Sequence, residues 1–169
     1  MQMILIAIGA NLPGRDGAMP IETCRAVVPL LCEIPGLHFI ALSQWYRSAP
    51  LPQSGQADYC NGVIRLRGEM PPEALLLRLH AIEEDFGRER SVPNAPRALD
   101  LDIIDLNGIV RTEHPPILPH PRAHQRAFVL LPLLEVAPAW RHPSLNLSVT
   151  TLLAELPPQK IRPWDAPAE

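Results

Sequence analysis

Apolar and polar positions follow two periods along this chain, which predict a mixture of strands and helices. Residues 3–8 are an apolar run of strand length, followed by a segment rich in Gly, Asn and Pro that ends regular structure. Apolar residues alternate with other residues over 37–45, and 59–67 is the next predicted strand. A helix is predicted from Pro20, where proline suits a first turn, and Pro29 should kink or shorten its end.

The second half of the chain continues this mixture. Apolar residues at helical spacing follow Pro71-Pro72-Glu73 and predict an amphipathic helix, which Gly87 closes. The Pro-rich end, 157–169, is predicted to be mobile. The remaining predicted elements are a tight turn at Asn107-Gly108, a short return strand over 109–111, a buried helix over 129–134 and a helix over 150–156.

Two carboxylates on one predicted strand are the strongest chemical signal. Between residues 99 and 104, apolar residues alternate with Asp100 and Asp102, so a strand would bury one set and place both aspartates on the opposite face. Carboxylates about 6.5 Å apart repel each other, and Arg97 alone cannot neutralise both, so a divalent cation is a natural complement. Two alternatives stay open: a merely solvated strand face, or a carboxylate pair of the glycosidase or nuclease kind.

Other polar residues surround this strand in the sequence. The preceding segment, 88–97, carries three arginines and two prolines, as a loop that binds polyphosphate would need. Tyr59 and Asn61 share one face of a strand and offer a ring and an amide to a flat heterocycle, although such a pair is also common as a structural feature. Residues 118–128 place two histidines and two arginines before an apolar run.

Composition narrows the class of protein. The 169 residues, with 47% hydrophobic and 20% charged content, predict a single domain over 1–169. A formal net charge of -3 argues against binding to nucleic acid or an anionic membrane and favours small-molecule partners. Three cysteines without metal-ligand spacing predict neither disulfides nor a zinc site. The first apolar run is too short for a signal peptide or membrane anchor, so we expect a cytoplasmic protein.

The ordered motifs resemble one known family, the 6-hydroxymethyl-7,8-dihydropterin pyrophosphokinases of folate biosynthesis. Its signature is similar to residues 95–104 here, where an Arg, two alternating Asp and an apolar pair stand at fixed offsets. Supporting matches are Ile6-Ala7-Ile8-Gly9-Ala10-Asn11-Leu12, Tyr46-Arg47-Ser48-Ala49-Pro50-Leu51, Asp58-Tyr59-Cys60-Asn61, Pro119-His120 and Arg126-Ala127-Phe128-Val129-Leu130. The resemblance runs nearly end to end.

The resemblance implies an α+β fold with a ferredoxin-like antiparallel sheet and helices packed mainly on one face. It also implies transfer of pyrophosphate from ATP to the pterin hydroxymethyl group, with release of AMP. We expect the protein to be a monomer. Two Mg²⁺ ions would be held by Asp100 and Asp102, which count as catalytic together with Arg88, Arg90 and Arg97. The implied pterin contacts are Gly9, Ser48, Pro50, Leu51, Tyr59, Asn61 and Phe128. The implied ATP contacts are His80, Glu83, Arg88, Arg90, Arg97, Ile104, His120 and Arg126.

The chain departs from the family pattern at three places. Asn94 stands where many members have a Trp that helps to close the site, and Pro115-Pro116 stands where some have an Arg. His80 is a glutamine in some members, so the change keeps a hydrogen-bonding group. Two other functions remain as alternatives: a catalytically impaired relative that binds pterin or nucleotide, and another Mg²⁺-dependent nucleotide hydrolase.

Overall fold

The described residues fold around one antiparallel sheet of six strands. The computed structural model describes residues 2–14, 17–49, 57–87 and 98–165. Its strands lie in the order β5-β1-β4-β3-β6, and β2 pairs with β4 beside this path. The strands are β1 (Ile4–Ala10), β2 (Leu37–Leu42), β3 (Tyr46–Ser48), β4 (Tyr59–Gly68), β5 (Asp100–Leu106) and β6 (Ile161–Pro163). The helices are α1 (Pro20–Cys32), α2 (Pro72–Asp85), the 3-10 turn η2 (Ala123–Gln125), α3 (Ala127–Val136) and α4 (Val149–Glu155).

Two hydrophobic cores form, one on each face of the sheet. Ile4, Ile6 and Ile8 of β1 join a first core with apolar residues of α1 and α2. Leu5, which points the other way because side chains alternate along a strand, joins a second core with residues of α3 and α4. The continuous apolar run in β1 therefore reflects a strand that is covered on both sides.

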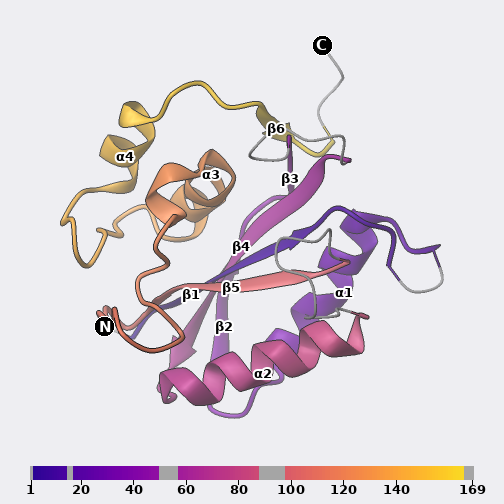
Figure 1. Cartoon of the computed structure of the whole chain (residues 1–169), viewed down its shortest axis with the longest axis horizontal. Helices are drawn as coiled ribbons and strands as arrows, with labels where there is room; N and C mark the ends of the chain where they lie inside the picture. The colour runs from indigo at the N-terminus through magenta and orange to yellow at the C-terminus, as the bar shows by residue number, and fades with distance from the viewer. Residues whose placement is uncertain (1, 15–16, 50–56, 88–97, 166–169) are drawn as a thin grey trace.

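Helices cover both faces of the sheet, which differs from the expectation that they would pack mainly on one face. Figure 1 shows α1 and α2 together on one side of the sheet, with α3 and α4 on the other. The reason is that strands β4 and β5 carry apolar side chains toward both sides: Val63 of β4 and Ile104 of β5 enter the second core and would otherwise face water. The predicted α+β class and the antiparallel sheet are confirmed.

The local predictions agree with the structure at most positions. The Asn107-Gly108 turn is confirmed, since both residues have the positive φ that such a turn needs, 53° and 74°. Pro29 lies inside α1, which continues to Cys32. The predicted return strand over 109–111 is reduced to an isolated bridge between Arg111 and Leu118.

The Pro-rich end of the chain is another difference from prediction. Within 157–169, which we expected to be mobile, residues 161–163 form β6 and pair with β3. Local composition pointed to a mobile tail, but the open edge of β3 pairs with these three residues. None of the described helices is both long enough and apolar enough to cross a membrane.

Candidate active site

One row of residues across three strands joins the aspartate strand to the amide predicted to bind a heterocycle. Gly9 of β1 pairs with Asp100 of β5 on one side and with Asn61 of β4 on the other. Directly opposed residues of an antiparallel sheet point to the same face. The sheet therefore brings Asp100 and Asn61, which are far apart in sequence, to either side of a glycine.

The glycine keeps the space within this row open. A Cβ atom at Gly9 would lie 3.2 Å from the Asn61 side-chain oxygen, closer than ordinary van der Waals contact. The other end of the Asn61 amide is fixed, because its Nδ2 donates a hydrogen bond to the Ser48 hydroxyl at 2.6 Å. Asn61 and Ser48 are both buried. The Asn61 oxygen is therefore held in a defined orientation above a residue that has no side chain.

The two aspartates lie on the sheet face that α3 covers, as their strand pattern predicted. Leu101 and Ile103 are buried in the first core, whereas Asp100 and Asp102 alternate with them and point to the opposite face. Both aspartates are partly exposed. The prediction that both aspartates lie on the strand face opposite to the buried apolar residues is thereby confirmed.

Positive and polar groups from the segment before α3 surround this pair. The His120 Nε2 atom lies 3.8 Å from an Asp102 carboxylate oxygen. Burial lowers the pKa of the half-buried Arg126, while the neighbouring Asp102 and Asp100 carboxylates oppose this effect. Tyr59 acts on the Arg126 pKa in the same sense as the carboxylates. The structure thus gathers predicted metal, ATP and pterin residues into one neighbourhood.

His120 is a neutral imidazole with a defined tautomer. Burial, followed by the charge of Arg126, lowers the pKa of His120 to about 4. Its Nδ1 accepts the backbone N–H of Arg122 at 3.1 Å, so the ring proton resides on Nε2, the atom nearest Asp102. His120 can therefore offer a hydrogen-bond donor beside the aspartates without bringing a positive charge.

Phe128 and Ile104 contribute apolar surface near the same residues. The Arg126 guanidinium carbon lies 5.3 Å from the centre of the half-buried Phe128 ring, within cation–π range. The Ile104 side chain is buried in the second core, and its carbonyl accepts the His120 N–H at 2.9 Å. The position of His120 is thus tied to the backbone of the aspartate strand.

Glu83, one of the implied ATP contacts, lies against the aspartate strand. Its side chain is fully buried, and a carboxylate oxygen accepts the N–H of Leu101 at 2.9 Å. Leu101 stands between the two aspartates on β5, which lies at the end of the strand order. Helix α2 thus supports the backbone of the aspartate strand through Glu83. His80, also on α2, is half-buried.

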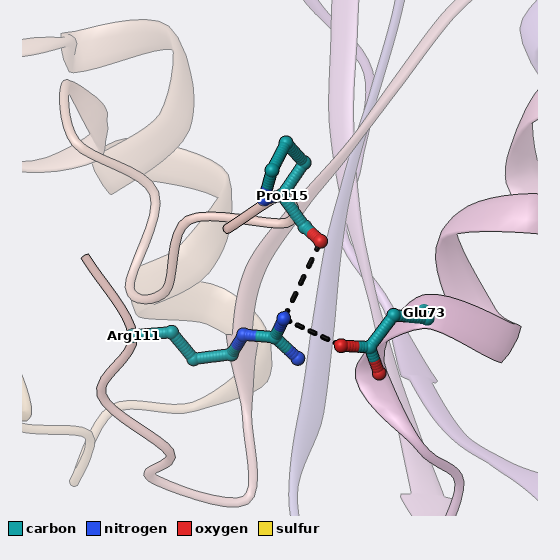
Figure 2. A network of polar contacts seen from close by, with 3 residues as sticks. All are labelled: Glu73, Arg111 and Pro115. Carbon is teal, nitrogen blue, oxygen red and sulfur yellow. Dashed lines mark hydrogen bonds and ion pairs between the residues drawn. The ribbon is translucent and has the colours of Figure 1, made fainter. Parts of the chain in front are cut away.

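Arg111, a residue that the sequence interpretation did not single out, holds the two ends of the segment that precedes His120 together. Arg111 and Leu118 exchange two backbone hydrogen bonds, of 2.8 and 3.0 Å. Figure 2 shows the Arg111 guanidinium between Glu73 of α2, at 2.5 Å, and the Pro115 carbonyl, at 3.4 Å. This contact lowers the pKa of Glu73. Pro115 therefore serves here as a backbone acceptor.

Several predicted residues fall outside the described part of the chain. They are Arg88, Arg90, Arg97, Pro50 and Leu51, together with Asn94. Their predicted roles stay predictions.

The oxygen atoms of the two aspartates fit a metal ion whose remaining ligands are phosphate oxygens and waters. Among the described residues, no three His, Cys, Asp or Glu side chains gather closely enough to hold a metal ion by themselves. Asp100 and Asp102 supply oxygen atoms from one strand face, and Mg²⁺ is commonly bound by one or two carboxylates plus substrate phosphates and waters. A pair of carboxylates next to Arg126 and a neutral imidazole suits a Mg²⁺–phosphate ligand.

A family model described as 7,8-dihydro-6-hydroxymethylpterin-pyrophosphokinase (HPPK) matches residues 5–138. The chain belongs to the HPPK family. This family membership confirms the resemblance that the sequence motifs indicated.

Proteins similar to this HPPK chain come from several kinds of organism. A 2-amino-4-hydroxy-6-hydroxymethyldihydropteridine pyrophosphokinase of Pseudomonas aeruginosa is 37% identical over 158 residues, which cover 93% of each chain. A protein of the same name from Synechocystis is 34% identical over 146 residues, covering 86% of this chain and 74% of the relative. A folic acid synthesis protein of Pneumocystis carinii is 30% identical over 162 residues; the match covers 96% of this chain but only 21% of that protein.

A solved structure confirms the fold. A crystal structure of an HPPK-DHPS in complex with substrates superposes with a TM-score of 0.69 at 12% identity, covering 90% of this chain and 43% of the other. The ferredoxin-like arrangement predicted from the motifs is therefore confirmed for this HPPK chain.

Besides Arg111, the sequence interpretation assigned no role to Arg122, which acts on His120. Arg122 donates its backbone N–H to His120 and helps to lower the pKa of that imidazole. Its position two residues after His120 was the sequence feature that could have indicated this contact. Gln159, which accepts the Ala127 N–H at the start of α3, lies in the Pro-rich end, where no local pattern indicates such a contact.

Proposed function

We propose that this chain transfers the pyrophosphoryl group of ATP to the hydroxymethyl oxygen of 6-hydroxymethyl-7,8-dihydropterin and releases AMP, as a step of folate biosynthesis. Family membership supports the reaction class. The observation that carries the proposal is the row Asp100, Gly9 and Asn61. This row places carboxylates suited to a metal–triphosphate next to an oriented amide suited to a flat heterocycle, as a transfer between these two substrates requires.

On this proposal, Asp100 and Asp102 hold two Mg²⁺ ions together with the ATP phosphates. The ions supply electrostatic stabilisation of the triphosphate when bound. Arg126 adds a permanent positive charge on the same sheet face, and the neutral His120 adds a hydrogen-bond donor through Nε2. The predicted phosphate contacts of Arg88, Arg90 and Arg97 belong to the same proposal.

The pterin side of the proposed site depends on hydrogen bonding and ring stacking. Asn61 presents its side-chain oxygen above Gly9 while Ser48 holds its amide nitrogen. An amide in a fixed orientation can distinguish donors from acceptors on the edge of a heterocycle. Phe128 offers a ring face, and Tyr59 lies two residues from Asn61 on the same strand. We propose that the enzyme acts as a cytoplasmic monomer.

The test measures AMP formed from ATP with and without 6-hydroxymethyl-7,8-dihydropterin and Mg²⁺. We expect AMP only when both are present. AMP formation that does not respond to the pterin would instead indicate a nucleotide hydrolase. Tight binding of both ligands without AMP would indicate a catalytically impaired relative.

A variant pair tests the role of the aspartates. Asp102→Ala should abolish turnover while calorimetry still detects pterin binding, because Asn61 and Ser48 are untouched. Asp85→Ala, an exposed carboxylate at the end of α2, is the matched control and should keep the parent rate. Near-parent activity of Asp102→Ala would overturn the metal assignment.

A further inference from the structure

The C-terminal segment 159–164 contacts both sides of the proposed pterin site. It lies beyond residues 5–138, the part of the chain that the family model matches. Gln159 reaches the start of α3: its side-chain oxygen accepts the N–H of Ala127 at 2.9 Å, and its amide nitrogen donates to the Gln125 carbonyl at 3.0 Å. Ala127 is the first residue of α3, between Arg126 and Phe128.

These contacts replace a local cap. The first N–H groups of a helix have no acceptor within the helix and need one from outside. Arg126, which precedes α3, makes no capping hydrogen bond with its own side chain in the described part of the chain. The acceptor for Ala127 therefore comes from a half-buried glutamine that lies 32 residues later in the sequence.

The residues that follow Gln159 attach to the other side of the site. The Lys160 carbonyl accepts the N–H of Ala49 at 3.2 Å. In the pairing of β6 with β3, Ile161 stands opposite Ser48, the residue that holds the Asn61 amide. At the end of β6, the Arg47 guanidinium carbon lies 3.8 Å from the centre of the Trp164 ring.

We propose that segment 159–164 is a strap that sets the spacing between β3 and the start of α3, with Gln159 as its positioning residue. The strap would thereby hold Ser48 and Phe128 at the separation that the pterin requires. Adjacent residues of one short segment bond to both elements, so a shift of one side would pull on the other. This inference rests on the proposed function.

Three variants test the strap. Gln159→Leu removes both side-chain hydrogen bonds at similar size and should raise the KM for the pterin about 5-fold at saturating ATP, with kcat nearly unchanged. Gln159→Glu keeps the acceptor for Ala127 but replaces the donor to the Gln125 carbonyl with an oxygen, so its pterin KM should rise less than that of Gln159→Leu. Gln2→Leu makes the same change at an exposed position and serves as the control.

Hydrogen exchange provides a readout that is independent of the substrate. The Ala127 amide should exchange faster in Gln159→Leu than in the parent, and not in Gln159→Glu. A Gln159→Leu variant with lower thermal stability but an unchanged pterin KM would overturn the strap, because its role would then be structural only. If the parent protein itself gave no pterin-dependent AMP, the proposed function would fail, while the exchange data would still report whether Gln159 protects α3.

Discussion

Replacing Glu83 tests whether α2 supports the aspartate strand or contacts the nucleotide. The resemblance to known relatives implies an ATP contact, but the structure shows a fully buried carboxylate that accepts the Leu101 N–H at 2.9 Å. Glu83→Ala removes that acceptor. We expect the variant to lose stability and to lower kcat, because the backbone between Asp100 and Asp102 loses its anchor.

The magnitude follows from the hydrogen bond. A buried N–H left without an acceptor costs about 1–3 kcal/mol, and an ionised acceptor places this bond toward the upper end. Glu83→Gln retains an oxygen for Leu101 but loses the charge, so we expect about 1 kcal/mol for Gln and about 3 kcal/mol for Ala. Misplacement of reacting groups by about 1 Å can cost about 100-fold in rate, so kcat should fall between about 10-fold and 100-fold in Glu83→Ala.

Urea denaturation and steady-state kinetics measure the two effects on the same samples. The denaturation midpoint should decrease in the order parent, Gln, Ala with an unchanged m-value, while the exposed Asp85→Ala control stays at the parent value. The reasoning is refuted if Glu83→Ala keeps the parent stability and raises only the KM for ATP. That outcome would indicate that Glu83 contacts the nucleotide.

Three further predictions concern stability. Burial and the hydrogen bond to Glu135 raise the pKa of Tyr46 to about 12. The neutral phenol therefore contributes fully to folding stability below about pH 10, and this contribution is lost as the pH rises from about 10 to about 12. Urea titrations at about pH 9 and about pH 11 should show a smaller loss of stability in Tyr46→Phe than in the parent. Trp140→Phe removes the indole N–H that donates to buried Asp105 at 2.7 Å and should cost about 2 kcal/mol in urea; a loss under about 0.5 kcal/mol would contradict this. Gly68→Ala should lower the melting temperature, because its φ of 149° and a Cβ 2.3 Å from a backbone oxygen leave no room; an unchanged melting temperature would argue against that crowding.

The amino-acid sequence by itself determined the features that depend on neighbouring residues. The alternation around Asp100 and Asp102 predicted which side chains are buried, and the period of two holds regardless of which strand lies alongside. The Asn107-Gly108 turn was predictable because few residues adopt positive φ at low cost. The family motifs added the set of site residues, because a family motif marks residues whose role depends on parts of the fold that are distant in sequence.

The tertiary structure alone decided how these pieces meet. The row of Asp100, Gly9 and Asn61 depends on which strands pair and in what register, and that choice is set by contacts between distant segments. Glu83 bears the sequence signature of a helix stripe, but only the position of α2 beside an open strand edge gives its carboxylate the Leu101 N–H. Gln159 lies in a Pro-rich stretch that local composition marks as mobile, and its hydrogen-bond partners, Ala127 at the start of α3 and Gln125 in η2, come from a distant part of the sequence. Local patterns thus specified the elements, whereas long-range pairing and packing assembled the site.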